Sequence, residues 1–425
     1  MPNSKIDAIA LCSDKCTGCT NCIRVCPTEA IRVKNRKAMI IKKRCINCGQ
    51  CVNVCPHNAL YGLTDDFSDV ENYQFPIALV DPVFYGQFNE NHLDPQLILE
   101  KIKALGFSLV WETSISSPII TEFTRKHLEK SEQFPVISSS CPAIIRTIQI
   151  RFPDLISNIL PMDSPVEIAA DMAIEHAQNT LKVPREKIGV FYISTCPARS
   201  YSFKYPVGRD ESNIDGTLSI KDIFLKISSM DSASKPENDY NPEFYPNGSA
   251  IGWARLGGQA QALSIKDFLA VDGIENVIDI LEEVEDDKLE NLRFLECQAC
   301  KNGCVGGNFC VENSFVARNR IRILTEKYQN YSTESTHEIL DRYLIQNPIE
   351  PFSVSSLDHD LSKALGKMEE INEVFSSLPD IDCGACGSPS CRALAEDIVM
   401  GYASLKDCIV LLKENDKDEE NNSEE

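Results

Sequence analysis

The 19 cysteines of this 425-residue chain are the residues whose spacing points most directly to chemistry. Most of them lie in two dense groups, at residues 16–55 and 383–408, and others stand between the groups. An odd number fits poorly with a closed set of disulfides, and C-x2-C runs in a large acidic chain favour metal ligation. With only 6 His, zinc sites of mixed Cys/His type have few ligands to draw on. The composition therefore favours iron–sulfur clusters.

The first dense group is an internal repeat in which two runs of C-x2-C-x2-C-x3-C-P follow one another. This is the bacterial ferredoxin pattern, and in it the fourth Cys of each run binds the cluster of the other run. We expect one 4Fe–4S cluster on Cys16, Cys19, Cys22 and Cys55, and a second on Cys45, Cys48, Cys51 and Cys26. Zinc ribbons are the alternative, but they rarely show two such runs that each close with Pro. Cys12 lies outside the runs and is expected to be a spare thiol.

The second dense group has four cysteines, Cys383, Cys386, Cys391 and Cys408. Gly384, Gly387 and Pro389 allow the backbone to turn tightly around a cluster. The helical period of residues 392–403 would carry the chain back to the last cysteine. The group resembles the small 4Fe–4S domain of corrinoid and electron-bifurcating proteins, which implies a further cluster here. A zinc site is the alternative.

Short apolar runs alternate with helical periods from about residue 75 onward. The runs are rich in β-branched and aromatic residues, as strands are, and they lie at residues 75–82, 107–113, 134–140, 187–195 and 292–297. Helical periods fall between them at residues 95–105 and 164–181, the second with Pro165 in its first turn. This alternation predicts an α/β core with a parallel sheet. Residues 210–250 are polar and rich in Asn, Ser and Pro, so we expect a loop insertion there.

We therefore expect an α/β core at residues 75–345, flanked by a two-cluster ferredoxin domain of α+β type at residues 1–65. A small helical four-cysteine domain at residues 360–412, opening with a long helix over 361–378, follows the core. An acidic tail, residues 413–425, is expected to be disordered.

Charge and hydropathy exclude several partners. The net charge of −21 argues against nucleic acid and anionic membranes, because their phosphates would be repelled. No stretch approaches 18 uncharged apolar residues, and the N-terminus lacks the apolar region of a signal peptide. We expect a cytoplasmic protein without a membrane span.

The cysteines of the predicted core stand just after predicted strands, where ligand sites of parallel sheets gather. The sequence around them resembles the C-terminal domain of the iron-only (FeFe) hydrogenase large subunit over residues 75–325. Residues 138–142 resemble the family motif T-S-C-C-P, residues 194–199 resemble M-P-C-x-x-K, and residues 296–307 resemble E-x-M-x-C-x-x-G-C-x-G-G. Ser164-Pro165 and Gly257-Gly258 also look like family landmarks.

The resemblance implies that a hydrogenase-like 4Fe–4S cluster is held by Cys141, Cys196, Cys300 and Cys304. It further implies that Cys304 bridges to a diiron subcluster with CO and CN ligands.

The departures from the family motifs bear on function. Ser140 replaces a thiol that relays protons in active hydrogenases, and a hydroxyl ionises far less readily near pH 7 than a thiol. Arg199 replaces a Lys that pairs with a cyanide ligand, and Ser202 replaces a relay carboxylate. Gln298 replaces a Met that packs on the diiron unit. Glu122 is the nearest carboxylate that could take over the relay.

Two functions remain open from the sequence. The arrangement of flanking cluster domains and the motif S-x-C-P-A-R in residues 194–199 resemble a sensory subgroup of the family. This implies a slow or sensory ferredoxin-type hydrogenase that works with a redox or signalling partner in an anaerobic cytoplasm. The alternative is an electron-transfer or iron–sulfur scaffold protein that has lost the diiron unit. Retention of Cys304 favours the first and loss of the relay thiol favours the second, while Cys297 and Cys310 are expected to be buried thiols.

Overall fold

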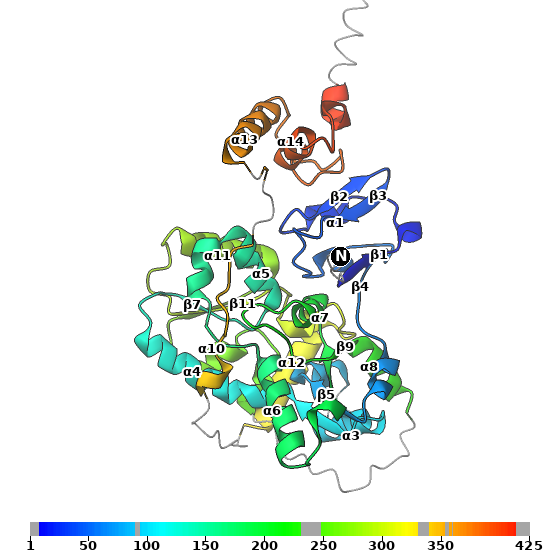
Figure 1. The fold of residues 1–425 in the computed structure, drawn as a ribbon, viewed down its shortest axis with the longest axis vertical. Coiled ribbons are helices and arrows are strands. Elements are labelled where there is room, and N and C mark those ends of the chain that lie inside the picture. The colour runs from blue at the N-terminus through cyan, green and yellow to red at the C-terminus, as the bar shows by residue number, and fades with distance from the viewer. Residues whose placement is uncertain are drawn as a thin grey trace, which may run out of the picture. The chain divides into compact units, whose positions relative to one another are not determined.

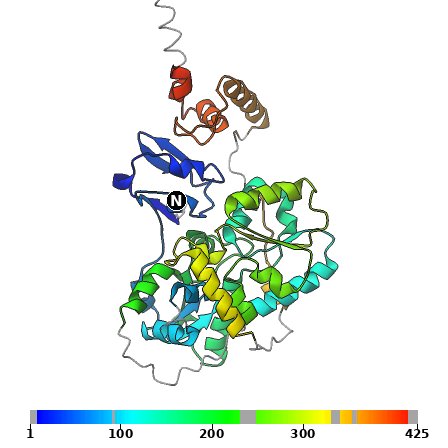
Figure 2. The same cartoon turned by 180° about the vertical axis from the view of Figure 1, so that it is seen from behind.

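The computed structural model of the chain describes residues 8–89, 94–230, 248–329, 340–352, 357–358 and 360–413. The chain forms two compact units. The central unit contains residues 62–351 together with residues 1–8, and the cysteine-rich unit contains residues 9–61 and 352–425. Figures 1 and 2 show their elements from opposite sides.

The central unit is built on two parallel sheets. A four-stranded sheet has the order β6 (Leu109–Glu112), β5 (Phe75–Val80), β8 (Ile188–Ser194) and β9 (Gly216–Ser219). A three-stranded sheet has the order β10 (Phe268–Asp272), β11 (Phe294–Gln298) and β7 (Val136–Ile137). All pairings within both sheets are parallel. The predicted parallel α/β core is therefore present.

The four-stranded sheet is covered on both faces, which explains why its strands are continuous apolar runs. Ala78 and Ile193 belong to one hydrophobic cluster, and Ile77 and Val190 belong to another. Successive side chains of a strand point to opposite faces, so the two clusters lie on opposite sides of the sheet. Helix α6 (Pro165–Asn179) supplies alanines to the second cluster.

The other helices of the central unit are α3 (Pro95–Ala104), α4 (Ser117–Lys130), α5 (Pro142–Arg151), α7 (Pro197–Lys204), α8 (Ile220–Ser228), α9 (Gly248–Gly252), α10 (Gly258–Leu263), α11 (Ile274–Glu285) and α12 (Ser314–Lys327). Helix α6 begins as predicted, with Pro165 in its first turn. The Ser164 hydroxyl, one residue earlier, accepts a hydrogen bond from the amide of Glu167 at 3.3 Å. This side chain caps the helix N-terminus.

The predicted loop insertion at residues 210–250 is wrong in part. Residues 216–219 form strand β9 and residues 220–228 form helix α8, which is capped by the Ser219 hydroxyl. Apolar residues of this helix belong to the hydrophobic core. The polar segments on either side of the helix made its apolar face difficult to recognise in the sequence. Residues 231–247 of the predicted insertion lie outside the described residues.

The cysteine-rich unit contains short elements around the two dense cysteine groups. The N-terminal segment has β1 (Ile9–Leu11), α1 (Asn21–Arg24), β2 (Ile31–Lys34), β3 (Lys37–Ile40) and α2 (Gln50–Asn53), with β4 (Leu60–Gly62) pairing with β1. The C-terminal segment has α13 (Leu361–Ser376) and α14 (Cys391–Val399).

The helix predicted over residues 392–403 ends earlier than expected. Helix α14 stops at Val399, and Gly401 then takes a positive φ of 75°. A separate 3-10 turn, Leu405–Asp407, brings the chain to Cys408. Residues 414–425 of the predicted acidic tail lie outside the described residues.

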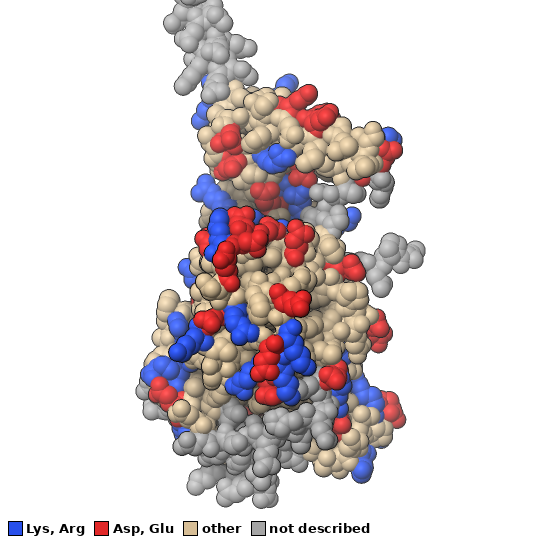
Figure 3. Space-filling view, turned by 90° about the vertical axis from the view of Figure 1, so that its left-hand side faces the viewer, with Lys and Arg blue, Asp and Glu red and all other residues tan. Residues whose placement is uncertain are grey.

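Acidic and basic side chains are interspersed across the face shown in Figure 3. No helix among the described residues has the length and apolar character needed to cross a membrane.

Candidate cluster sites and the strand-end cavity

The structure brings the cysteines of the first predicted cluster to one cavity in the cysteine-rich unit. Cys16, Cys19, Cys22 and Cys55 all line it, so the fourth cysteine of the second run lies with the first three of the first run. The space not filled by protein atoms is about 340 Å³, part of it open to solvent. Apolar side chains also line it, from Leu11, Val33, Ala38, Ala59 and Leu60, and the remaining lining residues are Thr17, Gly18, Thr20, Asn21 and His57. We call this space the first ferredoxin cavity.

In the second predicted cluster site, Cys26 of the first run likewise lies near the first three cysteines of the second run. Burial raises the pKa of the Cys48 thiol well above its usual range, and repulsion from the thiolates of Cys26, Cys51 and Cys45 raises it further. Burial and the same kind of repulsion raise the pKa of Cys22 in the first set to about 11. Thiolates gathered in this way are stable only beside positive charge, which the irons of a cluster would supply.

Hydrogen bonds to sulfur repeat along with the cysteines. The amide of Ala30 donates to the sulfur of Cys26 at 3.1 Å, and the amide of Ala59 donates to the sulfur of Cys55 at 3.2 Å. Both donors lie four residues beyond their acceptors. Such bonds stabilise thiolate and raise the reduction potential of a bound cluster. The internal repeat therefore extends from the ligands to the groups that tune them.

The C-terminal cysteines also converge. Cys391 and Cys408 are buried in one hydrophobic cluster, and Cys386 packs against it. Burial raises the pKa of Cys386, as do the neighbouring thiolates of Cys383 and Cys408. Among the described residues, no three Cys, His, Asp or Glu side chains lie close enough together to hold a single metal ion. The ligands of a 4Fe–4S cluster bind four different irons and so lie farther apart than the ligands of one ion.

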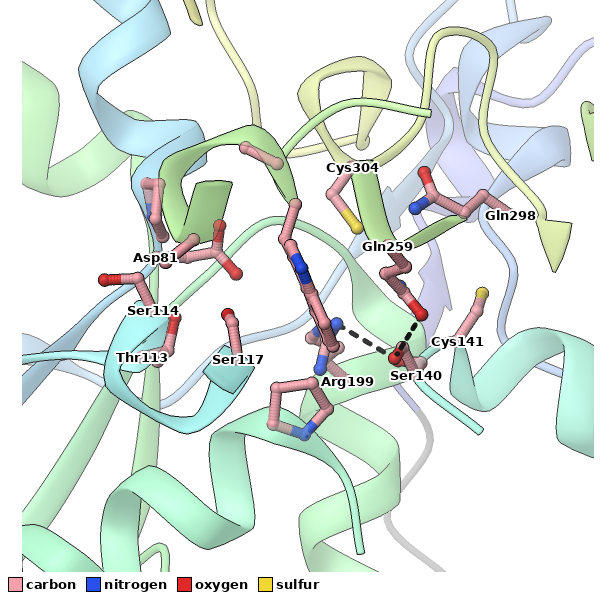
Figure 4. A pocket seen from close by; sticks show the side chains of 15 residues that line it. Asp81, Thr113, Ser114, Ser117, Ser140, Cys141, Arg199, Gln259, Gln298 and Cys304 are labelled. Carbon is pink, nitrogen blue, oxygen red and sulfur yellow. Dashed lines mark hydrogen bonds between the residues drawn. The ribbon is translucent and has the colours of Figure 1, made fainter. Parts of the chain in front are cut away.

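A polar cavity in the central unit lies where several parallel strands end. We call it the strand-end cavity (Figure 4). Asp81 follows β5, Thr113 and Ser114 follow β6, Ser140 and Cys141 follow β7, and Gln298 ends β11. Its unfilled space is about 470 Å³, part of it open to solvent. The carboxyl ends of parallel strands are where α/β proteins build ligand sites.

Two of the four core cysteines lie at this cavity, and Cys196 and Cys300 are outside its lining. Cys141 and Cys304 line it directly. Burial raises the pKa of Cys304 to about 12, and the thiolates of Cys141 and Cys196 contribute to the rise. Cys300 is half-buried on the turn that follows β11, and its carbonyl accepts a hydrogen bond from the amide of Gly303 at 3.1 Å.

The loop that carries Cys304 is fixed by a close backbone approach. A Cβ at Gly307 would lie 2.3 Å from the carbonyl oxygen of Thr195, at the end of β8. Only glycine permits this approach, which brings the loop of Cys304 next to the residue that precedes Cys196. The second glycine of the pair that ends the third motif is therefore explained by packing.

Arg199 is the cation of the strand-end cavity. Its guanidinium is buried, and Nη2 donates to the carbonyl oxygen of Ser140 at 3.1 Å. Burial opposes its charge, but Tyr192, Cys304, Asp81 and Cys196 outweigh that effect and keep its pKa above the ordinary value. Arg199 stays charged, with donors available to an anionic ligand.

The hydroxyl of Ser140 is held by a neighbouring amide. It donates to Oε1 of Gln259 at 3.2 Å, and the hydroxyl of Ser138 donates to the same oxygen at 2.6 Å. Figure 4 shows Ser140 between Gln259 and Arg199. A hydroxyl proton donated to Gln259 is already engaged and is less available to a ligand in the cavity, which reinforces the weak acidity of serine.

Two buried carboxyl groups near the cavity were missed by the sequence reasoning. Asp81 lines the cavity, and burial raises its pKa although Arg199, the amide of Val83 and the Tyr192 hydroxyl oppose the rise. Glu112 ends β6, and burial raises its pKa to about 8 against a hydrogen bond from the Tyr85 hydroxyl. Both acids end apolar runs that the sequence identified as strands, so their position was the available signal.

Glu122 is not brought to the cavity. It lies on α4, outside the cavity lining, and its oxygens lie 3.7 Å from Nη1 of Arg125 and 3.4 Å from Nζ of Lys126. Ser202 lies on α7, where its hydroxyl donates to the carbonyl oxygen of Arg199 at 2.9 Å. Of the buried carboxyl groups, Asp81 lines the cavity, whereas Glu112 ends the neighbouring strand β6 outside the lining.

The remaining cysteines show varied burial. Cys297 is buried on β11, and burial raises its pKa, with repulsion from Cys141 adding to the effect. The sulfur of Cys310 donates to the carbonyl oxygen of Cys304 at 3.6 Å. Cys12 is partly exposed, and its amide donates to the carbonyl oxygen of Ala59 at 2.7 Å.

The cavity residues fit a diiron unit with CO and CN ligands in most respects. Cyanide nitrogen accepts hydrogen bonds, and Arg199 and the indole of Trp253 are donors in the lining. Nε1 of Trp253 is buried and has no partner among the described residues. Oε1 of Gln298 is likewise buried and unpartnered there, but it is an acceptor, which CO and CN cannot satisfy. The donors and Cys304 favour the diiron unit, whereas the acceptors of Gln298 and Asp81 do not.

Comparison with known proteins agrees with this geometry. The family model of the iron-only hydrogenase large subunit, C-terminal domain, matches residues 74–268 and 258–308, together more than half of the chain. A 4Fe–4S dicluster domain matches residues 15–60, and a domain described as an Fe–S cluster domain matches residues 378–410.

Among curated relatives, an NADP-reducing hydrogenase subunit, HndD, from Solidesulfovibrio fructosivorans is 24% identical over 48% of this chain and 44% of its own length. Iron hydrogenase 1 from Clostridium pasteurianum is 20% identical over 57% of this chain and 51% of its own. The chain thus spans about half the length of these relatives.

A solved structure of the FeFe-hydrogenase HydA1 from Chlamydomonas reinhardtii shares the fold. Its TM-score is 0.51 at 14% identity, and the match covers 68% of this chain and 97% of that one. Because the family model matches across both sheets of the central unit, the chain belongs to the family defined by the C-terminal domain of the iron-only hydrogenase large subunit.

Proposed function

We propose that this protein is a hydrogenase-like iron–sulfur redox protein with a diiron unit in the strand-end cavity, acting as a slow hydrogenase or as a sensor of hydrogen or redox state. The observation that carries the proposal is the cavity lining itself. Cys304, the charged donors of Arg199 and the unpartnered indole of Trp253 all line one space at the ends of the strands. When bound, the diiron unit would supply the reversible reduction of protons to hydrogen.

The cysteines divide into four proposed 4Fe–4S sites: two in the N-terminal segment, one beside the strand-end cavity and one in the C-terminal segment. Cys141, Cys196, Cys300 and Cys304 would hold the cluster beside the cavity. An external redox or signalling protein in an anaerobic cytoplasm would exchange electrons with the sites of the cysteine-rich unit.

The residues of the cavity would bind and orient ligands more readily than they would move protons. Arg199 supplies a fixed positive charge, and its bond to the carbonyl of Ser140 holds the guanidinium in place. Gln259 accepts the hydroxyl proton of Ser140, so this group is a poor donor toward the cavity. Low turnover follows from this arrangement, because a positioned acid is worth about a hundredfold or more in rate.

One observation favours the second candidate, an electron carrier or cluster scaffold without the diiron unit. Asp81 lines the cavity and interacts electrostatically with Arg199, so part of the positive charge available to cyanide is already balanced. The buried Oε1 of Gln298, which has no hydrogen-bond partner among the described residues, also favours this second candidate.

An infrared spectrum in the CO and CN stretching region separates the two candidates. The protein would be purified without oxygen, loaded with 4Fe–4S clusters and matured with a synthetic diiron complex. We expect sharp CO and CN bands that shift under hydrogen, and we expect Cys304→Ser to abolish them. Cys310→Ser is the matched control, because that partly buried thiol lies close to Cys304 in the chain and is not a proposed ligand. Full cluster content without any bands would contradict the proposal and leave the carrier or scaffold.

A further inference from the structure

The sequence predicts the ferredoxin-type and four-cysteine segments as separate domains, but in the structure they pack together within the cysteine-rich unit. A buried ion pair joins them. Nε of Arg32, on β2, lies 2.5 Å from Oδ2 of Asp397, on α14, and Nη2 lies 3.3 Å from Oδ1. The Ser388 hydroxyl also donates to Oδ2 of Asp397, at 3.2 Å. Separating the segments would leave two buried charges without their partners, which is costly.

The two segments also meet backbone to backbone. The amide of Val33 donates to the carbonyl oxygen of Gly387 at 2.8 Å. A Cβ at Gly387 would lie 1.9 Å from the carbonyl oxygen of Val33, and its φ is +88°. The loop between Cys386 and Cys391 is therefore seated on the edge of β2 in a way that only glycine allows.

The contacts lie beside the cysteines of both segments. The Ser390 hydroxyl, next to Cys391, donates to Oε1 of Glu29 at 2.9 Å. Nη2 of Arg44, next to Cys45, lies 2.5 Å from Oε1 of Glu396. The docking surface thus includes residues next to predicted ligands of both segments.

One residue connects the C-terminal loop to the first ferredoxin cavity. Val33 is part of the lining of that cavity, together with Cys16, Cys19, Cys22 and Cys55. Its backbone bonds to Gly387, which directly follows Cys386. Gly384, which directly follows Cys383, faces Ile23, the neighbour of Cys22. Val33 therefore contacts both the first ferredoxin cavity and the glycine that follows Cys386.

We infer that the four-cysteine loop is a docked partner of the ferredoxin-type segment, and that its site and the first ferredoxin cavity are neighbouring cluster sites joined through Val33. The C-terminal segment then completes the electron-transfer module instead of forming a tethered domain with its own partner. The inference rests on the proposed function only in that both sites hold clusters.

Electron paramagnetic resonance of the fully reduced, full-length protein tests whether the sites are neighbours. Two reduced clusters that lie close together broaden each other's signals by spin–spin interaction. We expect Cys408→Ser, which removes a ligand of the C-terminal site, to narrow a component of the remaining signal. Gly387→Ala should narrow the same component, because the added Cβ forces the loop off β2. An unchanged spectrum of the remaining clusters in Cys408→Ser would overturn the inference.

Hydrogen–deuterium exchange tests the docking by itself, without relying on cluster signals. In the folded protein the amide of Val33 is protected by its bond to Gly387. We expect exchange in residues 31–34 to be about tenfold faster or more in Gly387→Ala and in Asp397→Asn. Gly401→Ala is the matched control for Gly387→Ala. Gly401 lies in the same segment with φ +75°, and its Cβ would meet no atom within 4 Å.

The two readouts separate the failure of the inference from that of the proposed function. Equal protection of residues 31–34 in the wild type and in both docking variants would overturn the docking, whatever the cluster content. Absence of the CO and CN bands would contradict the diiron proposal and would not affect the conclusion about docking.

Discussion

The two cavities of this protein recruit their ligands in opposite ways. The first ferredoxin cavity takes all four cysteines from residues 16–55, and its other lining residues are largely apolar. The strand-end cavity takes its lining from residues 81–304, and much of that lining is Ser, Thr, Gln, Asp and Arg. The first site is therefore defined by local spacing, whereas the second is defined by which strands end together. Cysteines suffice to identify the first, but the polar residues decide what the second can do.

The largest effect expected from this comparison concerns the local site. Cys22→Ser should remove one whole cluster, because its thiol is one of four that line a single apolar cavity. Iron and acid-labile sulfide would fall by the content of one 4Fe–4S cluster relative to the wild type. Cys12→Ser is the control and should change neither. Equal losses in both variants would show that spacing alone does not define the site.

The next effect concerns the polar side chains of the strand-end cavity. Ser140→Cys restores an ionisable thiol, and we expect hydrogen evolution by the matured protein to rise about tenfold to a hundredfold. Adding Gln259→Leu should raise it further, because the acceptor that now holds the Ser140 proton is removed. Turnover would be measured with a reduced dye at equal diiron content. No gain in either variant would show that proton delivery is limited elsewhere.

A smaller effect concerns the pH dependence of stability. The pKa of Glu112 is raised to about 8 in the folded state, so between about pH 4.5 and 8 this carboxyl holds a proton that the unfolded chain has released. Its stabilising contribution is complete below the unfolded pKa and is lost as the pH rises through the folded pKa. The slope reaches about 1.4 kcal/mol per pH unit for one proton.

Glu112→Gln should remove that part of the slope, as measured by urea unfolding of the full-length protein at several pH values between about 5 and 8. Glu122→Gln is the control, since that carboxylate is ion-paired on α4. Identical pH slopes for the wild type and Glu112→Gln would refute the buried, protonated state.

The smallest effect is spectroscopic. Trp253→Phe keeps an aromatic ring and removes the unpartnered donor, so a CN band of the matured protein should shift while the CO bands stay nearly in place. Trp111→Phe, the other tryptophan and not part of the cavity lining, should leave all the bands unchanged. Shifts of equal size in both variants would indicate a general change of packing.

Features set by local sequence could be predicted, whereas features set by contacts between distant segments could not. Strands 75–82 and 187–195 were recognisable because a buried parallel strand is a continuous apolar run. The positions of Asp81 and Glu112 near the strand-end cavity could not be predicted. Nothing in the local sequence shows that the ends of β5 and β6 lie beside the ends of β7 and β11. The sequence also predicts Glu122 as a relay carboxylate, because an ion-paired carboxylate on a helix surface cannot be distinguished from a relay carboxylate without the fold. The pairing of Arg32 with Asp397 was likewise out of reach, since the two lie 365 residues apart.

That separation has a consequence for biosynthesis. At about 5–20 residues per second, a ribosome would need roughly 20–70 s to advance from Arg32 to Asp397. During that interval the nascent N-terminal segment has no carboxylate to receive its guanidinium and no loop to cover the edge of β2. Docking of the two segments therefore cannot be complete until the whole central unit has been translated. A chain truncated before Asp397 would carry that defect permanently, which gives quality control a direct way to recognise incomplete copies.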